Sequence, residues 1–156
     1  MSLWNHYRNY TPGFYEELNG KPGRVGDPLH VCPRSIRRFW NGWIATGWFE
    51  WESEGYPFWS NMGHVQSWWD YRHLPNFLFV HYNDLLNDLE GEVLRVARYL
   101  DIEVSEEFLP SIVNLVTFAT VKQNAESISP GMEDSFRGGA QTFFYKGTNG
   151  RWKTVL

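Results

Sequence analysis

The chain has 156 residues, of which 42% are hydrophobic and 21% charged, which excludes a disordered segment and fits a globular domain. A net charge of −4 argues against nucleic acid or an anionic membrane surface as a partner. The single cysteine, Cys32, excludes an internal disulfide, and the sequence shows neither metal-ligand spacing nor an apolar run of about 18 residues. We therefore expect a cytoplasmic protein that binds no metal.

The first part of the chain predicts two helices with a long loop between them. A helical pattern over residues 2–10 ends at the turn-forming residues 11–13. Residues 19–33 are rich in glycine and proline and predict a loop or lid. Ser35 is then the N-cap candidate of a second helix, which extends to about Trp48.

A polar break follows over residues 50–57 and separates the second predicted helix from a third one. Its alternating Glu50, Glu52 and Glu54 favour a solvated face over an acid/base pair. The third helix is predicted over residues 59–71, because its apolar side chains recur on one face, and Pro75 lies beyond its end.

The central stretch of the sequence reads FLFVH over residues 77–81. An apolar run without a polar break predicts a strand buried on both faces, as in a parallel sheet. The polar residues 82–84 follow it, and ligands of open α/β sheets bind outside the carboxyl ends of the strands. An ordinary structural strand is the alternative.

Further helices are predicted downstream, which gives an α/β fold. One runs to Leu100 behind the cap candidates Asn87 and Asp88, and Ser105 is expected to cap another through Val113. A short helical turn over residues 117–122 and a loop over residues 127–140 complete the pattern.

The last stretch carries the chemistry. In residues 143–153, Lys146 precedes Gly147, and Gly150 and further basic residues follow. Glycines let a backbone approach an anion closely while lysine supplies positive charge, which predicts a phosphate-binding turn. A solvated basic loop is the alternative.

Five stretches in the same order along the chain resemble the sulfotransferases that use 3'-phosphoadenosine 5'-phosphosulfate (PAPS). YKGTNGRWK is similar to the family signature RKGxxGxWK, and FLFVHYNDL is similar to the strand that ends in YEDL. Residues 116–124 resemble the TSFxxMKxN helix, and residues 63–69 resemble the HVxSWW helix. Residues 1–7 resemble the helix whose serine binds the 3'-phosphate.

The resemblance implies an incomplete P-loop-type parallel sheet flanked by helices, with residues 1–156 forming a single partial sulfotransferase domain. It also implies a PAPS site in two parts. The adenine would lie among Tyr82, Val116, Thr117 and Phe118, and the 3'-phosphate would be held by Ser2, Lys146 and Gly147. The family arginine before Lys-Gly is Tyr145 here, and we hypothesise that Arg137 compensates for the lost phosphate donor.

The family's catalytic residues have no counterpart in this sequence. Its Pro-Lys-x-Gly-Thr loop and catalytic histidine would lie upstream of Met1, so no catalytic residue is assigned and the chain alone is expected to be inactive. His6 and His64 are the histidines best placed to act as a base, but a structural role is favoured for each.

Two functions of different class remain open. The first is the C-terminal part of a PAPS-dependent sulfotransferase that acts on a small hydroxylated acceptor and forms a homodimer at full length. The loop 13–33 and the segment 48–59 would enclose that acceptor. The second is a non-catalytic nucleotide-binding or protein-interaction module.

Overall fold

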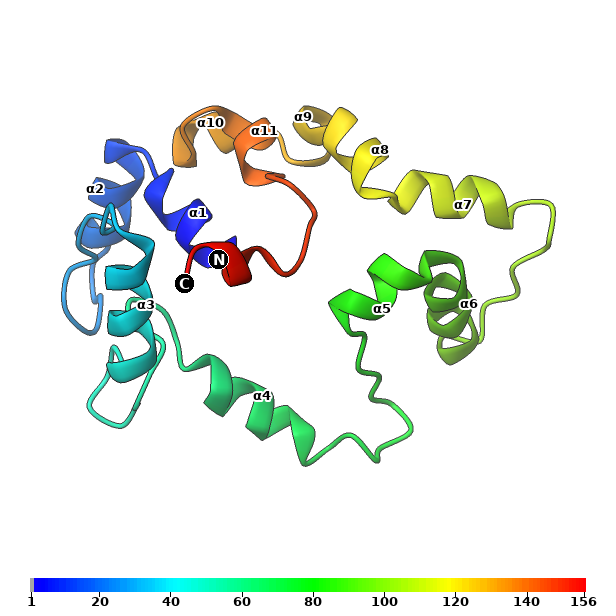
Figure 1. Ribbon diagram of the computed structural model, residues 1–156, viewed down its shortest axis with the longest axis horizontal. Coiled ribbons are helices and arrows are strands. Elements are labelled where there is room, and N and C mark those ends of the chain that lie inside the picture. Colours follow the sequence, from blue (N-terminus) through cyan, green and yellow to red (C-terminus); the bar gives the residue numbers. More distant parts are fainter. Residues whose placement is uncertain (1) are drawn as a thin grey trace. The chain divides into compact units, whose positions relative to one another are not determined.

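Helices make up nearly all regular structure in residues 2–156, the part of the chain that the computed structural model describes (Figure 1). The chain divides into two units. The first unit consists of the residues up to Ser67 together with Ala125–Leu156, and the second unit is Trp68–Asn124. Each unit is described by itself.

The first unit contains helices from both ends of the chain. Its elements are α1 (Ser2–Arg8), α2 (Pro12–Gly20), α3 (Ile36–Ala45), most of α4 (Asn61–Trp69), α9 (Ala125–Ile128), α10 (Met132–Ser135), α11 (Gly139–Phe143) and the 3-10 helix η1 (Arg151–Thr154).

Local capping explains where α2 and α3 begin. The hydroxyl of Thr11 accepts a hydrogen bond from the Phe14 N–H at 3.1 Å, and Pro12 occupies the first turn, where proline is tolerated. Residues 11–13, predicted only to end the first helix, therefore also begin α2, a helix that the sequence did not predict. Ser35 caps α3 as predicted, since its hydroxyl accepts from the Arg38 N–H at 3.3 Å.

The core of the first unit forms around α1. Tyr7, at 1% exposure, packs with the buried Leu29, Cys32 and Phe39. The Tyr7 hydroxyl donates a hydrogen bond to the His30 carbonyl, and the Tyr15 hydroxyl donates to the Tyr7 carbonyl at 3.1 Å. These two hydrogen bonds satisfy one backbone carbonyl of α1 and one of the predicted loop 19–33. The bond to His30 thereby holds that loop against the core.

The C-terminal part of the first unit is joined to the turn between α1 and α2. The Arg137 N–H donates to the Asn9 carbonyl at 2.8 Å, and Tyr10 and Phe136 form an isolated antiparallel bridge. The loop predicted over residues 127–140 is wrong, because α10 lies in it and α11 begins in it. Helices of four and five residues are too short to show a 3.6-residue period.

The second unit contains α5 (Tyr82–Asn87), α6 (Leu89–Tyr99), α7 (Leu109–Val116) and α8 (Phe118–Gln123). Asp88 caps α6 as predicted, since its carboxylate accepts from the Gly91 N–H at 2.9 Å. The predicted turn after Thr117 is α8. Ser105 does not cap α7 itself, which begins at Leu109, but its hydroxyl accepts from the Phe108 N–H at 3.4 Å and caps the turn that leads into that helix.

The strand predicted over residues 77–81 is not present in the described part of the chain. Residues 77–81 have no regular secondary structure, and the Phe79 carbonyl accepts a hydrogen bond from the Arg95 guanidinium at 2.9 Å. A strand exists only when a neighbouring strand pairs with its backbone. Phe79 and Val80 are 39% and 41% exposed, so this apolar stretch is not enclosed as a central strand would be.

The predicted parallel sheet is therefore not confirmed. Within residues 2–156, backbone pairing of the β type is limited to the bridge between Tyr10 and Phe136. The helices predicted to flank a sheet are present, so the helical part of the prediction is confirmed.

Replacing Tyr7 by Phe is expected to weaken the core of the first unit by about 1 kcal/mol, since the hydrogen bond from its buried side chain to the His30 carbonyl is lost. The reporter is Cys32, which is 8% exposed and whose thiol pKa is raised by burial to about 12. The labelling rate of this thiol should rise about fivefold. Tyr99→Phe in the second unit is the control, and equal rates in both variants would contradict the assigned bond.

Candidate functional site

The segment between α11 and η1 forms the basic turn that the sequence predicted. Gly147 and Gly150 have φ values of 59° and 74°, a left-handed conformation that favours glycine. The cationic groups of Lys146 and Arg151 lie 5.3 and 4.9 Å from the centre of the Tyr145 ring. The turn therefore gathers two positive charges beside glycine backbone that carries no Cβ atom, a combination that suits an anion.

Helix α1 connects this turn to the N-terminal side of the first unit. Ser2 lies exposed in its first turn, and His6 follows one turn later. The His6 Nε2 lies 3.2 Å from the Phe143 carbonyl oxygen, and the two rings stack with centroids 4.9 Å apart. Ser2, Lys146 and Gly147 thus belong to one unit, in which α1 contacts the end of α11.

Arg137 lies in the same unit, directly before a glycine with φ 82°. Its side chain is exposed. Burial raises the pKa of Tyr15, and the positive charge of Arg137 partly offsets this effect. The Arg137 backbone, whose N–H binds the Asn9 carbonyl, lies on the α1–α2 side of the unit.

The residues predicted around the adenine all lie in the second unit. Tyr82 begins α5 and is 46% exposed, while Val116, Thr117 and Phe118 are consecutive at the junction of α7 and α8. The Thr117 hydroxyl donates to the Asn114 carbonyl at 3.0 Å and accepts from the Thr120 N–H at 3.2 Å. The Thr117 hydroxyl therefore serves as the N-cap of α8. The methyl group of Thr117 and the ring of Phe118 remain available for contact with a nucleotide base.

The eight predicted residues are divided between the two units, four in each. Their joint site stays a prediction.

Two cavities lie in the first unit near the start of α4. One of about 560 Å³ is lined by Trp51, Glu52, Ser53, Glu54, Trp59, Ser60, Met62, Gly63, His64 and Ser67. The other, of about 350 Å³, is lined by Leu3, Trp43, Phe58, Trp59, Ser60, Asn61 and His64. The aromatic segment before α4 therefore shapes both cavities.

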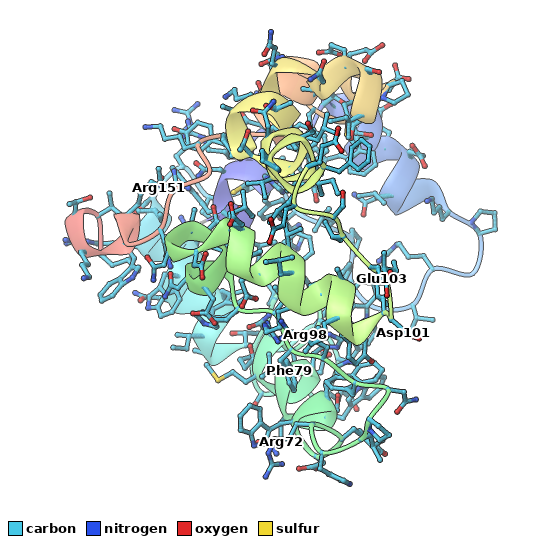
Figure 2. The ribbon with its side chains drawn as sticks, turned by 90° about the vertical axis from the view of Figure 1, so that its right-hand side faces the viewer. Arg72, Phe79, Arg98, Asp101, Glu103 and Arg151 are labelled. Atoms are coloured by element: carbon cyan, nitrogen blue, oxygen red, sulfur yellow. The ribbon has the colours of Figure 1, made fainter. Side chains whose placement is uncertain are left out.

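The second unit has a smaller cavity of about 260 Å³ at the end of α6. Arg98, Asp101 and Glu103 contribute to its lining, and Figure 2 shows Asp101 and Glu103 where the chain leaves α6. Charged residues of both signs line it, so this cavity shows no preference for an anion.

Of the three glutamates predicted to form a solvated face, Glu50 is exposed, Glu52 is half-buried and Glu54 is buried. Glu54 is only 4% exposed and accepts hydrogen bonds from the Ser60 hydroxyl and from the Met62 N–H, the latter at 3.0 Å. Glu52 accepts from backbone N–H groups of the Trp48–Phe49 segment and from the Ser60 N–H. Both carboxylates organise the loop before α4, a role that charge alternation alone does not reveal.

Hydrogen bonding also sets the charge state of Glu54. Burial is the largest single influence and raises its pKa, but the hydrogen bonds from the Ser60 hydroxyl and the first N–H groups of α4 together lower the pKa below its ordinary value. Glu54 is therefore a charged cap at the positive end of α4.

The two histidines considered as bases have different surroundings. Burial lowers the pKa of His6, and the hydrogen bond to Phe143 partly offsets that effect. This agrees with the structural role favoured by the sequence. His64 is exposed on α4 and lines both cavities of the first unit.

Comparison with known proteins identifies the family. The family model described as the sulfotransferase domain matches residues 35–156. The chain belongs to the sulfotransferase family. Human sulfotransferase 2B1 is 35% identical over 144 residues, which cover 89% of this chain and 34% of that protein.

Two further curated relatives agree with this assignment. Human sulfotransferase 1E1 is 32% identical over 123 residues, covering 78% of this chain and 37% of that protein. A glycolipid sulfotransferase of Mycobacterium bovis is 34% identical over 85 residues, covering 54% of this chain and 26% of that protein. The chain thus spans about a third of the length of the relatives it matches.

Solved structures show the same fold. Retinol dehydratase in complex with androsterone and the inactive cofactor PAP matches with a TM-score of 0.67 and 24% identity, covering 99% of this chain and 38% of that one. Mouse sulfotransferase SULT7A1 complexed with PAP matches with a TM-score of 0.64 and 18% identity, covering 99% of this chain and 47% of that one. Both matches extend over both units.

None of the helices described in residues 2–156 is long and apolar enough to cross a membrane. Among the same residues, no group of three or more His, Cys, Asp or Glu side chains is arranged to hold a metal ion.

Replacing Glu54 by Gln is expected to destabilise the first unit in a pH-dependent way. The folded pKa of Glu54 lies below its unfolded value, so its stabilisation is complete above the unfolded pKa and is lost as the pH falls through the folded pKa. The loss in free energy of unfolding should be about 1–3 kcal/mol near pH 7 and smaller near pH 3. Urea unfolding measures it, with exposed Glu50→Gln as control; a loss that is equal at both pH values would contradict the charged cap.

Proposed function

We propose that residues 1–156 are part of one sulfotransferase domain that uses PAPS as sulfuryl donor and a small hydroxylated molecule as acceptor. Membership of the sulfotransferase family supports sulfuryl transfer. The structural matches that carry PAP, the product that PAPS leaves after transfer, support the choice of donor. The cytoplasmic location expected from the sequence stays a prediction.

The observation that carries this proposal is the basic turn after α11. Lys146 precedes Gly147, whose φ of 59° suits glycine, and both match the Lys-Gly of the family signature. Because α1 with Ser2 contacts the end of α11 in the same unit, we assign the 3'-phosphate to Ser2, Lys146 and Gly147. Charge-assisted hydrogen bonds to phosphate are the strong ones, so Lys146 should contribute most of the affinity.

The adenine is assigned to the second unit. Tyr82 and Phe118 offer exposed aromatic surface, and Val116 and Thr117 lie next to Phe118. Aromatic rings stack on a base whatever its hydrogen-bonding pattern, so these residues would add affinity while the phosphate turn provides selectivity.

The acceptor is assigned to the first unit. The cavity of about 350 Å³ is lined by Leu3, Trp43, Phe58 and Trp59 together with polar groups of the α4 start, and binding pockets of small molecules are typically apolar with few polar groups. It includes part of the aromatic segment that the sequence predicted to enclose an acceptor.

The reaction we propose has a simple balance. The acceptor oxygen forms a bond to the sulfur of PAPS while the bond between sulfur and the 5'-phosphate oxygen breaks, which releases PAP. The acceptor hydroxyl proton goes to a base. No residue of this chain is assigned as that base, and we expect these 156 residues alone not to transfer sulfate.

Replacing Lys146 by Ala is expected to weaken PAP binding about tenfold or more, because a charge-assisted hydrogen bond to the 3'-phosphate is lost. Titration calorimetry measures it on the purified chain with PAP and with 5'-AMP, which lacks the 3'-phosphate. Lys21→Ala is the matched control, since it removes the same charge from an exposed ion pair with Glu17.

Equal loss for PAP and 5'-AMP, or equal loss in the Lys21 variant, would contradict the phosphate assignment. A wild-type chain that binds neither nucleotide would instead favour the protein-interaction module.

Arg137→Ala tests whether this arginine replaces the phosphate donor that the family has at the position of Tyr145. We expect a loss of PAP affinity of about three- to tenfold, with 5'-AMP affinity unchanged. Arg24→Ala provides the comparison, because its guanidinium donates to carbonyls of the loop after α2. If Arg137→Ala leaves PAP affinity unchanged while Lys146→Ala lowers it, the compensation hypothesis is wrong.

A further inference from the structure

The hydrogen bond between His6 and Phe143 closes the C-terminal end of α11. The last carbonyls of a helix lack an intrahelical donor, and α11 ends at Phe143. Because a carbonyl oxygen only accepts, the His6 Nε2 must carry the proton in this bond, at 3.2 Å. A side chain of α1 thus supplies the donor that the end of α11 requires.

The surroundings of this bond are aromatic. The His6 ring stacks on Phe143 at 4.9 Å and meets the edge of Phe136 at 5.8 Å. Phe136 and Phe143 are themselves in edge contact at 5.2 Å. The bond is half-buried among these rings, so the Phe143 carbonyl is only partly open to water and the loss of its donor weakens the contact between α1 and α11.

The bond connects the two parts of the first unit to which the 3'-phosphate is assigned. Ser2 and His6 lie one turn apart on α1, and residues at this spacing share a helix face. Lys146 follows Phe143 by three residues, so an extended chain places it at most about 11 Å further on. Fixing Phe143 to α1 therefore limits where Lys146 and Gly147 can lie relative to Ser2.

We propose that His6 is a positioning residue, which holds the Lys146–Gly147 turn against α1 and thereby sets the preference for nucleotides with a 3'-phosphate. This rests on the function proposed above. His6 itself contacts no substrate in this account. Its effect is transmitted through the Phe143 carbonyl and the short segment that follows it.

Two substitutions separate the hydrogen bond from the packing of the ring. His6→Phe keeps an aromatic ring for stacking on Phe143 but has no donor. His6→Gln keeps an N–H donor, since its Nε2 is as many bonds from Cβ as that of histidine. Backbone order parameters of Tyr145, Lys146 and Gly147 from nuclear spin relaxation report how firmly the turn is held.

The binding test uses the ratio of the 5'-AMP dissociation constant to the PAP dissociation constant. A general loss of folded protein weakens the binding of both nucleotides equally and leaves this ratio unchanged. We expect His6→Phe to lower this ratio about three- to tenfold and to reduce the order parameters of the turn. His6→Gln should restore both to within about twofold of the wild-type ratio and near its order parameters.

Several outcomes would overturn the proposal. An unchanged ratio or unchanged order parameters in His6→Phe would do so, and so would a failure of His6→Gln to restore them. In the wild-type chain alone, order parameters below about 0.6 at the turn would already contradict it, even if the variants do not fold. If the wild-type chain binds PAP no more tightly than 5'-AMP, the proposed function is contradicted instead. In that case the order parameters of the wild-type chain and of His6→Phe still show whether His6 holds the turn.

Discussion

The first unit depends on the two faces of the short helix α1. One face buries Tyr7 among Leu29, Cys32 and Phe39, where its hydroxyl satisfies the His30 carbonyl. The other face presents His6, which satisfies the last carbonyl of α11. Seven residues of helix are too few to be stable alone, so α1 persists because both faces are occupied. The same two contacts fix the long loop after α2 and the start of the basic turn, which are segments with little regular structure of their own.

Local features of the sequence predicted the structure well. Ser35 and Asp88 cap their helices as predicted, because an N-cap requires only a side-chain oxygen and an N–H two or three residues away. The predicted strand over residues 77–81 failed because a strand depends on a partner that its own sequence does not contain. The Phe79 carbonyl instead binds Arg95, which is a tertiary contact between an extended segment and α6.

In the candidate site, too, local patterns could be predicted from the sequence and long-range contacts could not. The Lys146–Gly147 turn could be predicted, because a glycine with positive φ beside a lysine is a local pattern. The hydrogen-bond partner of His6 could not, since Phe143 lies 137 residues away in the sequence. Glu54 was misread for a related reason: alternating charges suggest exposure, whereas its burial follows from hydrogen bonds to the start of α4. Membership of the sulfotransferase family supports sulfuryl transfer, and recognition of a sulfated nucleotide by these residues stays a proposal.

The central claim is that α1 and the basic turn together recognise a 3'-phosphate. The most direct test is an amide chemical-shift titration of the wild-type chain with PAP, and in parallel with 5'-AMP. We predict that the amides of Gly147, Lys146 and the first turn of α1 shift together with PAP, along one binding curve, and do not shift with 5'-AMP. Shifts of equal size with both nucleotides, or shifts that leave Gly147 and α1 unaffected, would contradict the account.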